Sequence, residues 1–467
     1  MPPIIKFGTD GWRGVIAEDF TMANLARVAL ATARYFRKHK KVKNGIIIGY
    51  DSRFMGKEFA QKSAEVIANA GIKVKLADSV STTPMVSLLT KIENAAAGIV
   101  ITASHNPPRY SGFKIKGEYG GPAHPEMIAA VEKVLGRVLK VKTLPLPKLS
   151  YSQLVVKGKI VPFSMKQRYL DDLATKIDLE KIRRSGLRIV YDSMYGAGQG
   201  VLDGMFPGMI QLHTEYNPSF AGTNPEPLAQ NLSEIITRMK QGGQDIGFAT
   251  DGDADRVGAV DEQGSFVDSH RIFALLLKYL VEHKGMKGDI VKSFSVSSMI
   301  DLQAKKYGLT LHETQIGFKY ICRMMTERDV LIGGEESGGL GVKGHLPERD
   351  GIFLGLLLCE LMAVRGKPLS ALVQELMDEF GQHEFHRIDL HLTEKEKQSI
   401  MKRFDRSVKE IAGYPVVGRK DTDGYKFFLE RGWVLVRASG TEPLIRFYAE
   451  AESRDKVNTL LTAVTER

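Results

Sequence analysis

Short apolar segments alternate with longer helical ones in the first third of the chain, and this alternation restricts the fold more than any other feature of the sequence. The predicted strands are β-branched runs of strand length at residues 45–50, 72–76 and 99–101. The predicted helices are residues 21–40, 57–70 and 84–91. Strands that alternate with helices in this way predict a mostly parallel, doubly wound α/β sheet.

The same pattern returns further along the chain and then changes. Residues 143–149 contain two prolines, which favour an extended linker. Strand 187–193 carries Tyr-Asp-Ser like the end of strand 45–50, which indicates duplicated domains. From residue 385 the chain has strands first and a helix last, which is typical of an α+β domain. We therefore expect four units, at residues 1–147, 160–267, 268–380 and 384–467.

Composition excludes several classes of protein. The 467 residues carry a formal charge of +10, but the Lys and Arg residues are spread out and no aromatic residues alternate with them, so we expect no nucleic-acid partner. The surplus of positive charge suits anionic small molecules. Two cysteines, no signal core at the N-terminus and no apolar run of bilayer length predict a cytoplasmic protein without a membrane anchor.

Ser104 stands where a predicted strand ends in Thr-Ala-Ser-His-Asn-Pro. Open α/β sheets bind ligands at such strand ends. His105 and Lys114 follow, so an exposed hydroxyl, an imidazole and an ammonium group come from one loop. On its own the Ser-His-Asn stretch favours a polar turn with a capping serine, and three other loops of the chain change that interpretation.

Three aspartates alternate after the predicted strand 245–250, at Asp251, Asp253 and Asp255. If the backbone stays extended there, their side chains point to one side and meet on one cation. Carboxylates without His or Cys favour Mg²⁺. The alternative is an acidic surface turn, in which the three like charges repel one another. Arg256 is placed to balance charge or to hold a phosphate.

Two further loops are rich in polar groups and glycine. Residues 437–443, with Arg446, offer guanidinium, hydroxyl and backbone N–H donors for a phosphate, or form a simple hairpin turn. Residues 333–339 offer Glu335 and Ser337 to sugar hydroxyls, or cap the following segment. Together the four loops indicate a phosphoryl transfer in which Ser104 carries the phosphate.

With these four loops in order, the whole chain resembles the α-D-phosphohexomutases. The resemblance implies three α/β domains and a C-terminal α+β domain, similar in fold to TATA-binding protein, around a central cleft. It implies a phosphoserine at Ser104 and one Mg²⁺ per chain, held by the Ser104 phosphate, Asp251, Asp253 and Asp255. It implies that Lys114, with His105 and Arg13 beside it, takes part in catalysis. The substrate-binding residues that it implies are Thr9, Arg256, Lys292, Lys319, Glu335, Ser337, Arg437, Ser439, Gly440, Thr441 and Arg446.

The implied reaction interconverts hexose 1-phosphate and hexose 6-phosphate through a hexose 1,6-bisphosphate, with glucose 1,6-bisphosphate as activator. Residues 334–338 and 317–320 resemble the phosphoglucomutase branch, whereas the opening Phe-Gly-Thr-Asp-Gly resembles the phosphoglucosamine mutases. Gly339 replaces a histidine that is frequent in mannose- and glucosamine-type loops. We expect glucose phosphate to be preferred, mannose phosphate to be tolerated, and a monomer or weak homodimer. The alternatives are a phosphoglucosamine mutase, a metal-dependent sugar phosphatase and a sugar-phosphate binding protein.

Overall fold

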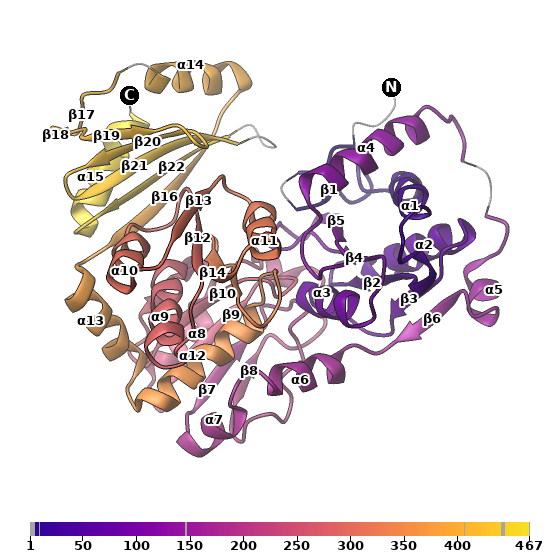
Figure 1. Ribbon diagram of the computed structural model, residues 1–467, viewed down its shortest axis with the longest axis horizontal. Coiled ribbons are helices and arrows are strands. Elements are labelled where there is room, and N and C mark those ends of the chain that lie inside the picture. Colours follow the sequence, from indigo (N-terminus) through magenta and orange to yellow (C-terminus); the bar gives the residue numbers. More distant parts are fainter. Residues whose placement is uncertain (1–4, 9, 145–146, 406, 440–443, 467) are drawn as a thin grey trace.

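The computed structural model describes residues 5–8, 10–144, 147–405, 407–439 and 444–466. Four sheets of four or more strands succeed one another along the described part of the chain (Figure 1), and the last is accompanied by the two-stranded sheet of β17 (Glu410–Ile411) and β18 (Tyr414–Pro415). The first lies on the right of the view, and the fourth, in yellow, lies at the upper left above the third. We call each sheet with its helices a unit, numbered I to IV. The structure thus has three α/β units and a C-terminal α+β unit, as the sequence predicts.

Unit I is built on a six-stranded sheet in the order β1-β5-β4-β2-β3-β6. Strands β4, β2, β3 and β6 are parallel, and β5 and β1 continue the sheet antiparallel. Helices α1, α2 and α4 pack together, and α3 packs against α6 (Lys166–Ala174) of the following unit. The elements of this part of the chain are β1 (Trp12–Val15), α1 (Met22–Phe36), a short 3₁₀ helix (Val42–Asn44), β2 (Ile46–Tyr50), α2 (Gly56–Asn69), β3 (Val74–Ala77), α3 (Thr83–Ile92), β4 (Ala97–Ile101), β5 (Tyr110–Lys116), α4 (Pro125–Leu139), α5 (Tyr151–Val156) and β6 (Ile160–Phe163).

Two details of unit I differ from the sequence-based expectation. Helix α1 ends at Phe36 and not near residue 40, because Phe36 is the last apolar side chain of its buried face and only basic residues follow up to 41. Strand β6, which the sequence places at the start of the second unit, pairs in parallel with β3 and belongs to the sheet of unit I. The chain crosses back over unit I before it enters unit II.

Units II and III have smaller sheets with the same plan, a parallel centre and an antiparallel edge. Unit II has the order β11-β10-β9-β7-β8, and unit III has the order β13-β12-β14-β15. The elements of unit II are α6 (Lys166–Ala174), α7 (Leu179–Ser185), β7 (Ile189–Asp192), β8 (Ile210–Leu212), 3₁₀ helices (Phe220–Gly222 and Ala229–Asn231), α8 (Ser233–Lys240), β9 (Ile246–Thr250), β10 (Val257–Asp261) and β11 (Phe266–Val267). The elements of unit III are α9 (Ser269–Glu282), β12 (Asp289–Ser293), α10 (Met299–Tyr307), β13 (Leu311–Thr314), α11 (Phe318–Glu327), β14 (Val330–Gly334), β15 (Leu340–Val342), α12 (Gly351–Arg365) and α13 (Leu369–Phe380).

Unit IV is a five-stranded antiparallel sheet in the order β16-β22-β21-β20-β19. One face packs against α14 and α15 through its own apolar core. The other face places Trp433, Leu435 and Tyr448 against Phe294 of unit III. The elements are β16 (Glu384–His391), α14 (Glu394–Asp405), β17 (Glu410–Ile411), β18 (Tyr414–Pro415), β19 (Gly418–Lys420), β20 (Tyr425–Leu429), β21 (Gly432–Ala438), β22 (Leu444–Ala451) and α15 (Arg454–Thr465).

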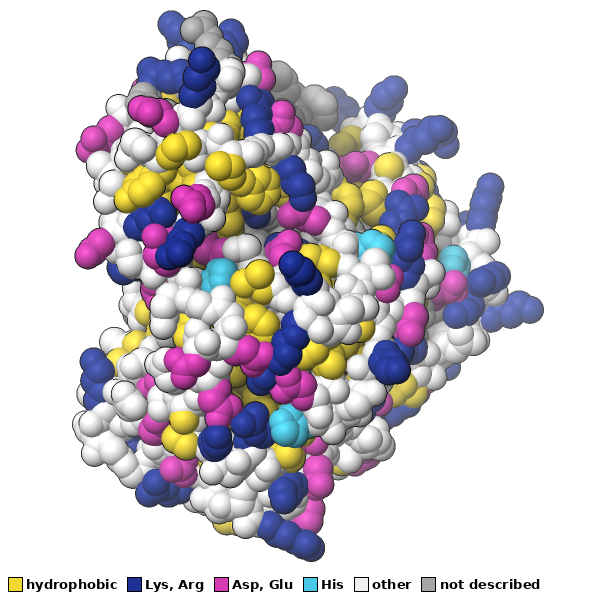
Figure 2. Space-filling model, turned by 60° about the vertical axis from the view of Figure 1, so that its left-hand side comes forward, with side chains coloured by type: hydrophobic (Ala, Val, Ile, Leu, Met, Phe, Trp, Pro, Cys, Tyr) yellow, Lys and Arg dark blue, Asp and Glu magenta, His cyan; other side chains and the backbone are white. Residues whose placement is uncertain are grey.

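The surface carries charges of both signs. On the face seen in Figure 2, Lys and Arg side chains are interspersed with Asp and Glu rather than gathered into a stripe. Both cysteines, Cys322 and Cys359, are buried as free thiols. Across the described ranges, no helix is both long and apolar enough to cross a membrane.

Candidate active site

The loop after β4 presents Ser104 to unit II. Ser104 has a left-handed backbone (φ 53°), and its N–H donates to Thr102 Oγ1 at 2.8 Å. Its hydroxyl donates to Asp251 Oδ2 at 2.8 Å. The serine is 1% exposed, contrary to the expected exposed hydroxyl, because the loop of unit II lies on top of it. A Cβ at Gly252 would overlap the carbonyl oxygen of Ser104, so glycine is required for this approach.

Arg53, in the loop that follows β2, holds the Ser104 loop through hydrogen bonds to its backbone. Its guanidinium donates to the carbonyl oxygens of Ser104 (2.6 Å), Asn106 (2.7 Å), Pro107 (2.9 Å) and Tyr110 (3.0 Å). It also pairs with Asp51 at 3.2 Å, and both side chains are fully buried. Sequence reasoning missed this residue. The available signal was an Asp-Ser-Arg run at the end of a buried strand.

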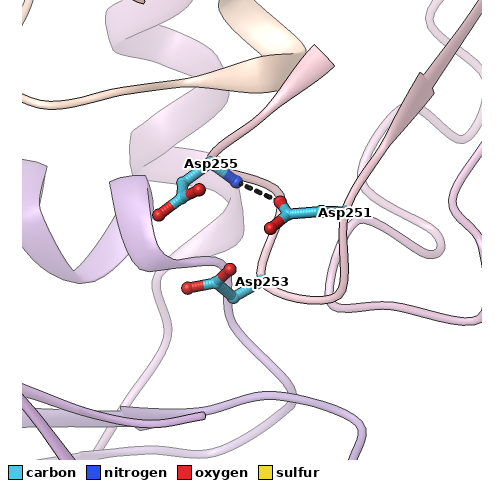
Figure 3. Close-up of side chains that lie close together, drawn as sticks. All are labelled: Asp251, Asp253 and Asp255. Carbon is cyan, nitrogen blue, oxygen red and sulfur yellow. Dashed lines mark hydrogen bonds between the residues drawn. The ribbon is translucent and has the colours of Figure 1, made fainter. Parts of the chain in front are cut away.

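The three aspartates of unit II come together as expected, but by a different backbone path. Their carboxylates turn toward one another (Figure 3), with ligand atoms within 4.8 Å. The segment forms a turn and not an extended strand, and Ala254 is left-handed (φ 59°). Asp251 Oδ1 accepts the backbone N–H groups of Asp255 (2.9 Å) and Arg256 (3.1 Å), which fixes the turn.

This cluster fits a divalent cation. Asp253 Oδ1 and Asp255 Oδ1 are buried, and neither has a hydrogen-bond partner among the described residues. A buried carboxylate oxygen without a partner is costly, and a hard cation removes that cost. Burial, and then repulsion by Asp255 and Asp253, raises the pKa of Asp251 well above its usual range. The three carboxylates therefore repel one another unless positive charge is added.

Lys114, on β5, supplies part of that charge. Its ammonium lies 2.8 Å from Asp10 Oδ2, 2.8 Å from Asp253 Oδ2 and 3.2 Å from Asp255 Oδ2. Burial by itself would lower the pKa of Lys114, but these carboxylates raise it above the ordinary value. Lys114 is therefore a charged hydrogen-bond donor in this arrangement.

The pKa of His105 is shifted in the direction opposite to that of Lys114. Burial, and then Arg256, Arg13 and Lys114, hold its pKa well below the usual range. Its Nδ1 lies 3.4 Å from Ser104 Oγ. The imidazole is neutral at neutral pH and is able to accept a proton beside the serine.

Two residues that sequence reasoning missed, Asp10 and Arg349, join this network. Arg349 Nη2 lies 2.8 Å from Asp10 Oδ2 and 2.6 Å from Asp255 Oδ2. Its Nη1 lies 3.7 Å from Glu335 Oε2, so one guanidinium faces carboxylates of units I, II and III. The only signal for Arg349 was a Glu-Arg-Asp triplet before an apolar helix.

In the loop predicted to bind sugar hydroxyls (residues 333–339), Glu335 follows directly after β14. Its Oε1 accepts the N–H of Gly317 at 2.8 Å, and burial raises its pKa to about 7. Lys319, two residues after Gly317, is half-buried, and burial lowers its pKa while Asp10 opposes that shift. Ser337 is half-buried in the same loop as Glu335. The structure thus brings these three predicted residues to one edge of unit III.

The predicted phosphate site lies on unit IV. Arg437 on β21 and Arg446 on β22 are direct cross-strand partners. Arg437 pairs with Asp423 at 3.0 Å and Arg446 with Asp389 at 3.4 Å. Ser439 follows directly after β21 and donates its N–H to Leu444 O at 2.9 Å, which ties it to β22. Gly440 and Thr441, like Thr9 in unit I, lie outside the described residues.

Sequence reasoning also missed Arg387. It lies on β16 and pairs with Asp389 at 2.9 Å. Its charge helps to lower the pKa of both His105 and Glu336, so this part of unit IV faces the site in units I and III. A long alternating strand gave no sign that one of its basic residues would lie there.

The remaining predicted residues are Arg13, Arg256 and Lys292. Arg13 donates to Asn106 Oδ1 in the Ser104 loop, and Arg256 Nη1 pairs with Glu226 Oε1 at 2.9 Å. Lys292 is buried in unit III, where it pairs with Asp301 and donates to Ser297 O at 3.3 Å. Among the described residues, these contacts of Lys292 point into unit III and not to the Ser104 loop.

The chain matches four family models, in order along the sequence. Each is described as phosphoglucomutase/phosphomannomutase: alpha/beta/alpha domain I over residues 5–142, domain II over 167–264, domain III over 268–380 and the C-terminal domain over 390–467. Together they account for most of the chain.

Individual relatives match over nearly their full lengths. A phosphoglucomutase/phosphomannomutase of Thermococcus kodakarensis is 29% identical, with 97% of this chain and 96% of that protein covered. A phosphoglucosamine mutase of Carboxydothermus hydrogenoformans is 32% identical, with 99% of each covered. A solved structure from Thermus thermophilus, with the provisional name phosphomannomutase, has a TM-score of 0.86 and 34% identity over 100% of this chain and 99% of that one.

Proposed function

The chain belongs to the phosphoglucomutase/phosphomannomutase family of phosphohexomutases, and on that premise we propose that it interconverts glucose 1-phosphate and glucose 6-phosphate through a phosphoserine at Ser104. The observation that carries the proposal is the Ser104 hydroxyl, buried and 2.8 Å from Asp251 Oδ2 in a cluster of three carboxylates. A nucleophilic hydroxyl at a cation site suits the transfer of a phosphoryl group.

Asp251, Asp253 and Asp255 would hold Mg²⁺, together with an oxygen of the Ser104 phosphate. The assignment is supported by Asp253 Oδ1 and Asp255 Oδ1, which have no hydrogen-bond partner in the part of the chain that the structure describes. When bound, the cation neutralises charge on the phosphoryl oxygens. Lys114 adds a second positive charge beside the same carboxylates.

In the forward direction, the free hydroxyl of the hexose phosphate attacks phosphorus, and the bond from phosphorus to Ser104 Oγ breaks. The proton of the attacking hydroxyl passes to the neutral imidazole of His105, and the imidazole, 3.4 Å from Ser104 Oγ, gives a proton to that oxygen as the serine hydroxyl forms again. The Lys114 ammonium donates hydrogen bonds where negative charge gathers. The bisphosphate then turns, its other phosphate returns to Ser104, and the second hexose phosphate leaves.

Turning requires a site that holds whichever phosphate is not reacting. Arg437 and Arg446, side by side on unit IV, supply two guanidinium groups for it. Glu335 and Ser337 face the sugar between the two phosphates, with Lys319 beside them. A site buried between units also keeps water away from the phosphoserine, which favours transfer to sugar over hydrolysis.

The preference for glucose is supported by the resemblance of residues 334–338 and 317–320 to the phosphoglucomutase branch. Relatives named phosphoglucosamine mutase make glucosamine phosphate the second candidate substrate. The two candidates share the same chemistry and differ in the sugar that fits against the loop of Glu335.

The test is turnover of glucose 1-phosphate to glucose 6-phosphate with Mg²⁺ and a trace of glucose 1,6-bisphosphate, beside mannose 1-phosphate and glucosamine 1-phosphate. We expect glucose 1-phosphate to be fastest, and Ser104→Ala to abolish turnover. Ser79→Ala, an exposed serine of unit I, is the matched control and should leave turnover unchanged. Faster turnover of glucosamine 1-phosphate would refute the sugar preference. Release of free phosphate in place of isomerisation would refute the mutase.

A further inference from the structure

Arg349 reaches the site by crossing directly over Gly339. A Cβ at position 339 would overlap Arg349 Cδ and lie 2.6 Å from its Cγ. Gly339 does not have the left-handed backbone that favours glycine, so its conformation is open to any residue. The side chain of Arg349 is therefore what excludes a side chain at position 339.

Gly339 is also the residue that closes the sugar loop. Its carbonyl oxygen accepts the N–H of Glu335 at 3.1 Å, so the loop from 335 to 339 forms a closed turn. Arg349 lies on this turn, and its guanidinium stands 5.3 Å over the ring of Phe318. The far end of Arg349 is fixed by Asp255 and Asp10, at 2.6 and 2.8 Å. It cannot move aside without losing contacts that are buried from water.

From this packing we propose that Arg349 is a positioning residue, which fixes the sugar loop (residues 335–339) against the metal loop (residues 251–255), and that the absence of a side chain at Gly339 is what allows it to do so. The proposal rests on the proposed function. Arg349 holds Glu335 on one side and Asp255 on the other, so the distance from the sugar to the phosphoryl group depends on one guanidinium. A shift of about 1 Å in such an arrangement costs on the order of 100-fold in rate.

The test is a double-mutant cycle of Gly339→Ala and Arg349→Ala. Each single substitution should lower kcat by about 100-fold with a smaller change in KM, because geometry and not sugar affinity is lost. In the Arg349→Ala protein, Gly339→Ala should cost less than about twofold more, since the side chain that it displaces is already gone. Arg349→Lys should recover part of kcat, because the charge remains while the bridge between two carboxylates is lost.

Two matched controls report general damage. Gly136→Ala adds a Cβ that meets nothing within 4 Å, and Arg323→Met removes an exposed guanidinium 2.9 Å from Glu126; both should keep wild-type kcat. Additive losses in the cycle, with an active wild-type protein, would overturn the proposal and leave the mutase intact.

Hydrogen exchange tests the same coupling without any turnover. Gly339→Ala should speed exchange in residues 251–255 as well as in residues 335–339. A change confined to the sugar loop would overturn the coupling. A wild-type protein that turns over no hexose phosphate would instead refute the proposed function. The hydrogen-exchange result would then still test whether Arg349 couples the two loops.

Discussion

Replacing Arg53 by methionine tests whether the Ser104 loop depends on one buried guanidinium. Arg53 is 1% exposed, pairs with Asp51 at 3.2 Å and donates to four carbonyl oxygens of the loop between Ser104 and Tyr110. Methionine of similar length keeps much of the packing but removes all five interactions. Breaking a buried ion pair from one side costs about 3–5 kcal/mol, and we expect Arg53→Met to destabilise the protein by that amount.

The size of the loss depends on pH in a defined direction. Burial raises the pKa of Asp51 to about 6, while Arg53 opposes the shift. The folded state therefore favours the protonated carboxyl, and the stability from that proton is complete below about pH 4 and is lost as pH rises through about 6. Without Arg53 the pKa of Asp51 rises further. The difference between wild type and Arg53→Met should be smaller at pH 5, where the loss comes mainly from the four carbonyl contacts, and largest at pH 8, where the ionised Asp51 also loses its partner.

Urea unfolding at pH 5 and pH 8, followed by circular dichroism, measures the difference, and mutase turnover measures its effect on Ser104. Arg109→Met is the matched control, because Arg109 lies in the same loop and is exposed. Arg53→Lys should fall between wild type and Arg53→Met, since an ammonium group cannot reach the same four carbonyls. An Arg53→Met protein with wild-type stability at pH 8, or with wild-type kcat, would refute the reasoning.

Four further substitutions test other parts of the site. Burial raises the pKa of Glu335 to about 7, so the ionised form, which would accept hydrogen bonds from sugar hydroxyls, is lost as pH falls below 7. The KM for hexose phosphate should therefore rise below pH 7 in the wild type and stay constant in Glu335→Gln. Parallel pH profiles of the two proteins would contradict this. Asp255→Asn should weaken Mg²⁺ binding by more than about tenfold in a calorimetric titration, and an unchanged affinity would argue against the metal site. Gly252→Ala should lower kcat by about 100-fold because its Cβ displaces the Ser104 carbonyl, and normal kcat would show that the loops can separate freely. Arg437→Met should raise KM for hexose phosphate more than it lowers kcat, and a pure loss of kcat would place Arg437 at the reacting phosphate instead.

The parts of the site that sequence reasoning found are those with a local signal. Ser104 follows a predicted strand, Lys114 comes ten residues later on β5, where the sequence predicts the same loop, and the three aspartates stand close together in the chain. Even there the backbone path differed, because Ala254 turns left-handed and the segment is not extended. Residue type and spacing predicted the cluster of three carboxylates, but they did not predict how the backbone would assemble it.

The residues that were missed have partners far away in the sequence. Arg349 meets Asp10, 339 residues away, and Arg53 meets Ser104, 51 residues away. The nearby acidic residues in the chain, Asp51 for Arg53 and Glu348 and Asp350 for Arg349, do not show which distant group each arginine will meet. The exposure of Ser104 was predicted wrongly for the same reason, since the loop that covers it belongs to unit II.

The sequence by itself determined the alternation of strands and helices, the four units and the functional groups that each loop carries, because apolar periodicity, turn residues and clustered functional groups act over a few residues. The tertiary structure decided which groups are buried together, and burial in turn decided their charge. It makes Lys114 a permanent cation, keeps His105 neutral and brings Glu335 to the edge of ionisation at neutral pH. These properties arise only when loops from separate units exclude water from one another, and desolvation of this kind depends on contacts between distant parts of the chain.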